Sequence, residues 1–75
     1  MYLDANTSLS VSLEMAMVEA VVVELHLRGG HTFKGRIASI GEDCVIIDPI
    51  AGREFFGAHL RIADIVAVSV QTRRA

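Results

Sequence analysis

The sequence has little of several features that would define a class of protein. Its 75 residues include one cysteine, one proline and no tryptophan, and no uninterrupted apolar run exceeds four residues. The lone Cys44 excludes a disulfide-stapled mini-protein and favours a reducing, cytoplasmic compartment. Runs this short exclude a membrane-spanning helix, which needs roughly 18 apolar residues. The N-terminus has no basic start and no apolar stretch after it, so no secretory signal is expected.

Apolar residues are abundant for so short a chain. They make up 52% of the sequence, and the mean hydropathy is +0.46. Abundant Val and Ile argue against a disordered chain. A domain of this length buries only about 60% of the surface of its unfolded chain, so part of the apolar excess would remain exposed on a monomer. We therefore predict one small domain with apolar surface buried between subunits.

Charge is unevenly distributed along the chain. The formal net charge of −2 argues weakly against a general nucleic-acid binder. Residues 1–27 carry four acidic and no basic side chains. Residues 28–75 carry all seven basic residues against five acidic ones, a net charge of +2. Any positive patch is therefore expected in the second part of the chain.

The first 19 residues contain neither glycine nor proline and allow two interpretations. Apolar residues alternate with polar ones from Leu9 to Met17, which is typical of a strand. Leu13, Met17 and Ala20 also fall on one face of a helix. Leu, Met, Ala and Glu favour helix, and the residues just before Leu9 are suitable N-caps, namely Asn6, Thr7 and Ser8. We predict a short helix within residues 8–19.

Five short strands are expected in the remainder, because apolar alternation is interrupted by glycine and proline turns. The predicted strands cover residues 21–28, 32–40, 44–48, 53–60 and 65–71. Gly35 and Gly57 stand inside predicted strands and mark sharp bends or close backbone approaches. Bending there predicts that residues 20–71 curl into a small antiparallel barrel, which would protect the sheet edges. Residues 1–19 form a separate N-terminal segment, and residues 72–75 a polar tail that frays.

Two stretches of the chain resemble the motifs of the Sm/LSm family, to which bacterial Hfq proteins belong. Alternating apolar residues from Val21 are followed by a glycine turn and the spacing Phe33-x-Gly35-x-Ile37, as in the first Sm motif. Leu60-Arg61 followed by an apolar strand is similar to the second motif. The resemblance implies a mainly β fold of the Sm-like (Src-homology-3-like) type. It has five strongly bent antiparallel strands and a short N-terminal helix.

The chain departs from the family at positions that contact RNA. Family members that bind uridine-rich RNA have an Asp and an Asn in the turn between the second and third strands. Those positions are Gly41 and Val45 here, and the glycine that follows the motif arginine is Ile62. The resemblance therefore implies the fold more strongly than it implies RNA binding.

The resemblance also implies assembly into a ring of five to eight subunits, with the fourth strand of one subunit paired with the fifth of the next. Phe55 and Phe56 would place an aromatic ring on each face of the fourth strand. The fifth strand is apolar on both faces, with Val66, Val68 and Val70 on one side and Ile65, Ala67 and Ser69 on the other. The predicted oligomer interface consists of Phe55, Phe56, Val66, Val68 and Val70. The alternative is that both strands are central in a monomeric barrel.

Arg61 and His59 are the candidate nucleic-acid-binding residues. Arg61 matches the arginine of the second Sm motif, which lies at the ring pore and contacts RNA phosphate or a base. Its alternative role is an ion pair with Asp64 or with an acidic residue of a neighbouring subunit. His59 would be repeated in every subunit beside that pore.

No catalytic, metal or cofactor site is expected. The three histidines lack the tight ligand spacing of a zinc site. Cys44 follows two acidic residues, which disfavour a reactive thiolate, so a buried structural cysteine is expected. The sequence therefore predicts a ring-forming protein, not an enzyme, that binds RNA or another ligand and does not enter a membrane. The alternative is a structural or protein-interaction module on the same oligomeric barrel.

Overall fold

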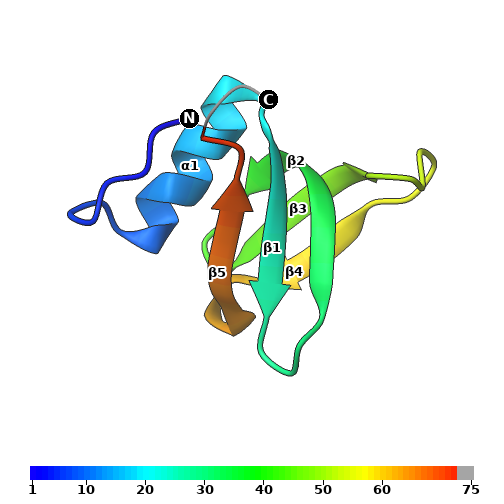
Figure 1. Ribbon diagram of the computed structural model, residues 1–75. Coiled ribbons are helices and arrows are strands. Elements are labelled where there is room, and N and C mark those ends of the chain that lie inside the picture. Colours follow the sequence, from blue (N-terminus) through cyan, green and yellow to red (C-terminus); the bar gives the residue numbers. More distant parts are fainter. Residues whose placement is uncertain (73–75) are drawn as a thin grey trace.

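One five-stranded antiparallel sheet and one N-terminal helix make up the protein in the computed structural model, which describes residues 1–72 (Figure 1). The strand order across the sheet is β4-β3-β2-β1-β5. The predicted mainly β fold with a short helix is confirmed. In chain order the elements are α1 (Leu9–Glu19), β1 (Val22–Leu27), β2 (Thr32–Ile40), β3 (Cys44–Ile50), β4 (Ala58–Arg61), a 3₁₀ turn (Ile62–Asp64) and β5 (Ile65–Val70).

The N-terminal segment is helical, so the strand interpretation of residues 9–17 was wrong. The hydroxyl of Ser8 accepts a hydrogen bond from the Val11 N–H at 3.2 Å and caps the first turn. Ala20 ends the helix in the left-handed conformation, with φ of 55°. Leu13 and Ala16 are the buried residues of the helix, while Ala20 is exposed and does not extend their face.

Gly35 makes the close backbone approach that its position in the sequence predicts. It pairs with Val23 on one side and with Ile50 on the other. A Cβ atom on Gly35 would collide with the Pro49 carbonyl oxygen and would lie 2.6 Å from a methyl carbon of Ile47. β3 can therefore cross β2 closely at this point only because residue 35 has no side chain.

The fourth strand begins later than the sequence predicts. β4 starts at Ala58, and β3 continues through Ile50, where a turn was expected. Hydrogen bonds from the Arg53 N–H to the Ile50 oxygen and from the Phe56 N–H to the Arg53 oxygen, both 2.9 Å, fold the intervening chain into turns. Phe55 therefore lies in a projecting β3–β4 turn, and the placement of the two phenylalanines on opposite faces of a strand was wrong.

The predicted side-chain alternation of the fifth strand was also wrong at its start. Ile65 pairs with Leu27, but the next pair joins His26 to Ala67, so Val66 is an extra residue in a β-bulge. The bulge shifts the alternation by one residue. Ile65 is consequently buried, and Val66 is 59% exposed instead of sharing a face with Val68.

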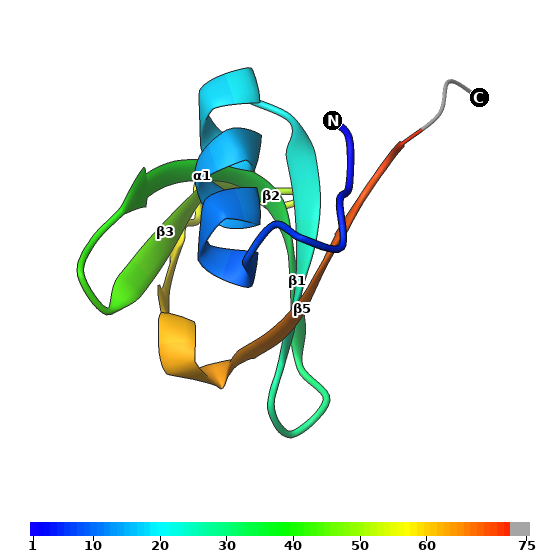
Figure 2. The same cartoon turned by 90° about the vertical axis from the view of Figure 1, so that its left-hand side faces the viewer.

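The sheet does not close into a barrel. It curves around a core to which α1 contributes Leu13 and Ala16. Figure 2 shows the helix lying across the curve, with β3 to one side and β1 and β5 to the other. β4 and β5 are the two ends of the strand order, and each pairs with one neighbour only. The predicted barrel closure is thus not observed in the single chain, which leaves two strand edges free.

Candidate functional site

The outward face of the β3–β4 hairpin brings the two predicted nucleic-acid-binding residues together. Arg61 pairs with Cys44, Leu60 with Val45, and His59 with Ile46. Side chains alternate between the two faces of a strand. Because Leu60 is buried in the core, its neighbours His59 and Arg61 both point outward and are exposed.

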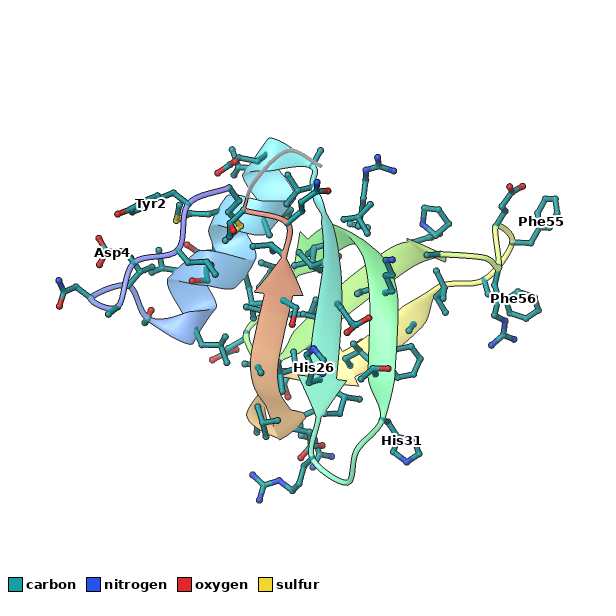
Figure 3. The ribbon with its side chains drawn as sticks, in the orientation of Figure 1. Tyr2, Asp4, His26, His31, Phe55 and Phe56 are labelled. Atoms are coloured by element: carbon teal, nitrogen blue, oxygen red, sulfur yellow. The ribbon has the colours of Figure 1, made fainter. Side chains whose placement is uncertain are left out.

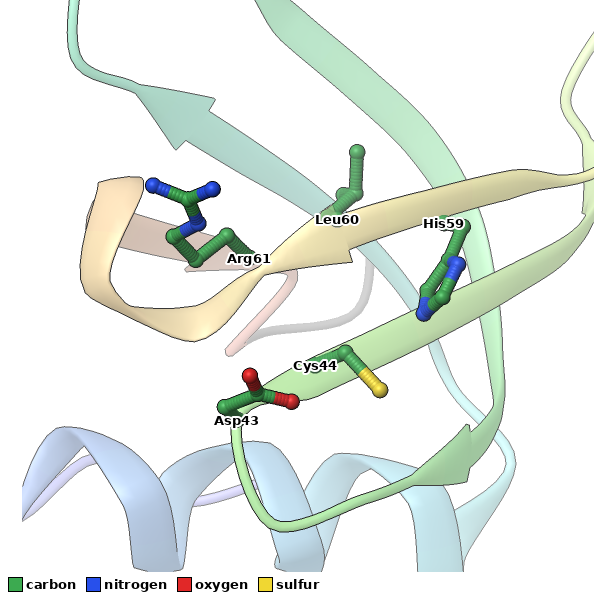
Figure 4. Close-up of a pocket in the computed structure, with 5 residues that line it drawn as sticks. All are labelled: Asp43, Cys44, His59, Leu60 and Arg61. Atoms are coloured by element: carbon green, nitrogen blue, oxygen red, sulfur yellow. The ribbon is translucent and has the colours of Figure 1, made fainter.

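A surface hollow lies over this hairpin (Figure 4). Its lining residues are Asp43, Cys44, His59, Leu60 and Arg61. The Ile62 N–H donates to the Asp43 carbonyl oxygen at 2.8 Å and holds the two ends of the hairpin together. The volume of about 230 Å³ is below the ~300–1,000 Å³ typical of small-molecule sites. The hollow is large enough for a phosphate group or the edge of a base.

Arg61 makes no ion pair within residues 1–72. Asp64, the partner considered from the sequence, is bound instead by Arg28, with 3.9 Å between Arg28 Nε and Asp64 Oδ1. The Arg28 N–H also donates to the Asp64 carbonyl oxygen at 2.8 Å, which places the two residues side by side. The intrachain alternative for Arg61 was therefore wrong, and its guanidinium remains available to an anion. Cys44, expected to be buried, is half-exposed beside it.

One of the two positions that the Sm resemblance would assign to RNA contact has no access to a ligand. Val45 is fully buried and belongs to the core cluster. Gly41 lies in the β2–β3 turn, where its N–H donates to the Cys44 carbonyl oxygen at 2.8 Å. Neither residue offers a polar side chain to a ligand.

A second polar cluster, which sequence reasoning missed, lies on the outward face of β1 and β5. His26 Nε2 is 2.9 Å from Ser69 Oγ and 3.3 Å from Glu24 Oε1 (His26 is labelled in Figure 3). A serine–histidine–acid triad needs the acid on the other ring nitrogen. Since both contacts use Nε2, this cluster is not arranged as a triad. Only the β1–β5 pairing brings Ser69 to His26, and the sequence separation of 43 residues hides that contact.

The predicted interface residues occupy two separate regions. Phe55 and Phe56 are 97% and 53% exposed at the end of the β3–β4 turn (Figure 3). The Arg53 guanidinium carbon lies 4.2 Å from the centroid of the Phe56 ring, a cation–π contact that orders the turn. Val68 and Val70 are half-buried on β5, at the opposite edge of the sheet.

These observations define a small mainly β protein built on one bent, open sheet with an N-terminal helix. The helix is not long and apolar enough to cross a membrane, and it is the sole α-helix of residues 1–72. Within the same residues, no three His, Cys, Asp or Glu side chains gather where a metal ion would bind. The chain matches no protein-family model, and no curated protein is similar to it in sequence.

Proposed function

We propose that this protein is an Sm-like ring subunit, in which β4 of one subunit pairs with β5 of the next. The supporting observation is that both strands are free edges of the same bent sheet. Unpaired edge N–H and C=O groups bind another strand readily. Two different edges that join head to tail form a closed ring when the rotation between subunits allows closure.

The proposed ligand of the ring is single-stranded RNA, held by Arg61 and His59. Arg61 is exposed, has no ion-pair partner within residues 1–72, and lies beside His59 on the outward face of β4. A guanidinium binds phosphate through charge-assisted hydrogen bonds. Repetition in every subunit would multiply a weak single contact into useful affinity.

A structural or protein-interaction ring without RNA is the second candidate. It is favoured by the net charge of −2 and by the burial of Val45, which removes one of the family's RNA contacts. Asp43 also lines the hollow beside Arg61 and would repel a phosphate. The two candidates share the assembly and differ in whether RNA binds.

Binding of labelled oligo(U), oligo(A) and mixed-sequence RNA at low and high salt separates the candidates. The RNA proposal expects micromolar or tighter binding that weakens as salt rises, because phosphate contacts release counterions. No binding to any of these RNAs at low salt would eliminate that proposal and leave the interaction module.

Assembly has its own variant test, the substitution Val68→Asp. The charge would stand at the proposed β4–β5 junction, so the particle mass should fall toward that of the monomer. Val18→Asp, at an exposed position of α1 outside both edge strands, is the control and should leave the mass unchanged. Circular dichroism confirms that both variants remain folded.

A further inference from the structure

The end of the β3–β4 turn exposes an aromatic pair on an ordered support. Phe55 is 97% exposed. The turn beneath it is fixed at 2.9 Å by a hydrogen bond from the Ile50 N–H to the Phe56 oxygen, and at 2.7 Å by one from the Ala51 N–H to the Lys34 oxygen. The turn projects from the body of the protein (Figure 3). Exposed apolar groups on an ordered projection are typical of a contact surface.

A complementary depression lies near the other edge of the sheet, at the C-terminal end of β5. Two adjoining hollows of about 510 and 530 Å³ share Val22 and Gln71 in their linings. Val70 lines one of them, and Val22 is 39% exposed. One chain therefore carries both a projecting aromatic pair and a partly apolar depression, which extends from the end of β5 across β1 to Lys34 and Ala51 at the base of the turn.

The alternation of side chains fixes how β4 would meet β5 of the next subunit. Buried and half-buried residues must face the same side, because a slip of one residue reverses every side chain. Leu60 and Ala58 point inward on β4, and Val68 and Val70 point inward on β5. The antiparallel register that matches both inward pairs places Leu60 opposite Val68 and Ala58 opposite Val70.

In this register, the projecting turn of one subunit lies next to the depression of the following subunit. Gly57 falls opposite Gln71 of the next subunit, so the chain just before Gly57 enters the region lined by Gln71 and Val22. We propose that Phe55 and Phe56 of one subunit insert into this depression on the next subunit. The inference rests on the proposed β4–β5 pairing and adds the receiving surface to it.

Two further observations support a second copy of this chain as the occupant. All four strand pairs of the sheet are antiparallel, so antiparallel pairing across the junction continues the existing pattern. The turn carries Arg53 and Glu54 next to the phenylalanines, and the depression is lined by one acidic and two basic side chains, Glu24, Lys34 and Arg36. The net positive charge of the depression is complementary to the Glu54 carboxylate of the turn.

Cysteine pairs in a Cys44→Ser background test the geometry. His59→Cys with Ser69→Cys reports the edge register, since these positions lie directly opposite each other in the proposed pairing. Phe55→Cys with Val22→Cys reports insertion of the turn. Phe55→Cys with Val66→Cys is the matched control, because Val66 is exposed at the other end of β5. After mild oxidation, covalent multimers are separated on a non-reducing gel.

The proposal expects multimers from the His59→Cys/Ser69→Cys variant and from the Phe55→Cys/Val22→Cys variant. It expects none from the Phe55→Cys/Val66→Cys variant. Multimers from the His59→Cys/Ser69→Cys variant alone would support the β4–β5 edge pairing. They would refute the insertion of Phe55 and Phe56 into the depression. Multimers from the Phe55→Cys/Val66→Cys variant in place of the Phe55→Cys/Val22→Cys variant would refute the antiparallel direction of β4 against β5 of the next subunit. No multimers from any pair, together with a monomer mass for the unmodified protein, would refute the underlying ring as well.

A dilution experiment adds a quantitative readout. The double variant Phe55→Ser/Phe56→Ser should raise the concentration at which the assembly dissociates by at least tenfold. Val18→Ser removes an apolar side chain that is 80% exposed on α1, outside both edge strands, and should cause no such rise. An equal effect of the two changes would show that the phenylalanines do not contact a neighbouring subunit.

Discussion

The substitution Gly35→Ala tests the bend of β2 at residue 35. This bend lies between the free β4 edge and the free β5 edge of the sheet. The added Cβ would collide with the Pro49 carbonyl oxygen, a backbone atom, and would lie 2.6 Å from Cγ2 of Ile47. Ile47 is fully buried in the core and packs against its other members, so it can shift only by displacing them. Overpacking of this kind costs about 1–3 kcal/mol, and we expect the upper end because one of the two obstacles is backbone.

This loss of stability is large compared with the total stability of a chain of this size. At ~0.05–0.15 kcal/mol per residue, 75 residues have about 4–11 kcal/mol of total stability. A loss of about 3 kcal/mol should lower Tm by roughly 12–24 °C, at ~4–8 °C per kcal/mol for a small domain. Urea unfolding followed by far-UV circular dichroism at one fixed protein concentration measures the loss.

Gly30→Ala is the matched control for this experiment. Gly30 has a φ of +91°, and a Cβ atom there would have no neighbour within 4 Å, so alanine adds backbone strain without a collision. A left-handed alanine costs about 1–2 kcal/mol. If Gly35→Ala destabilises the protein no more than Gly30→Ala does, the close crossing of β2 and β3 is not what requires a glycine.

Three further substitutions have defined outcomes. Ser8→Ala should lower the free energy of unfolding by about 1 kcal/mol in urea titrations, because it removes the cap of α1. Arg61→Gln should weaken RNA binding and flatten its salt dependence by roughly 0.7 in the log–log slope for each phosphate that the protein no longer neutralises. Arg28→Gln should change that slope less, because Arg28 is already paired with Asp64; equal slopes for the two variants would contradict the assignment of the phosphate contact to Arg61.

Local sequence patterns predicted most of the elements correctly. The helix follows from helix-forming residues preceded by Ser8, and its N-cap hydrogen bond has the expected spacing. β2 has the predicted bounds, Thr32–Ile40, because alternation and glycine punctuation agree there. The close approach at Gly35 also follows from a glycine inside a strand pattern.

The errors arose where long-range pairing overrides local alternation. The sequence around Phe55 alternates well enough for a strand, but hydrogen bonds to Ile50 and Arg53 fold it into turns. The bulge at Val66 depends on the register with β1, which the sequence of β5 alone does not contain. The predicted barrel closure was not observed for the same reason. Pairing between β4 and β5 depends on contacts that no local pattern encodes.

The candidate site was only partly predictable. The sequence predicted His59 in the fourth strand and Arg61 in the corner after it, whereas the structure includes both in β4, where residues two apart share a face. The pairing of Asp64 with Arg28 was missed because it joins residues 36 positions apart through the end of β1. Asp64 was the intrachain partner considered for Arg61, so the sequence alone left the ion pairing of Arg61 open.

Ring assembly underlies both candidate functions, and the mass of the native particle decides whether it occurs. The subunit mass is 8.1 kDa. Light scattering at micromolar concentration should give a discrete mass five to eight times larger, because each free β4 edge would be paired with the β5 edge of a neighbour. A mass of 8.1 kDa under the same conditions would refute the ring, since both edges would then remain unpaired in solution.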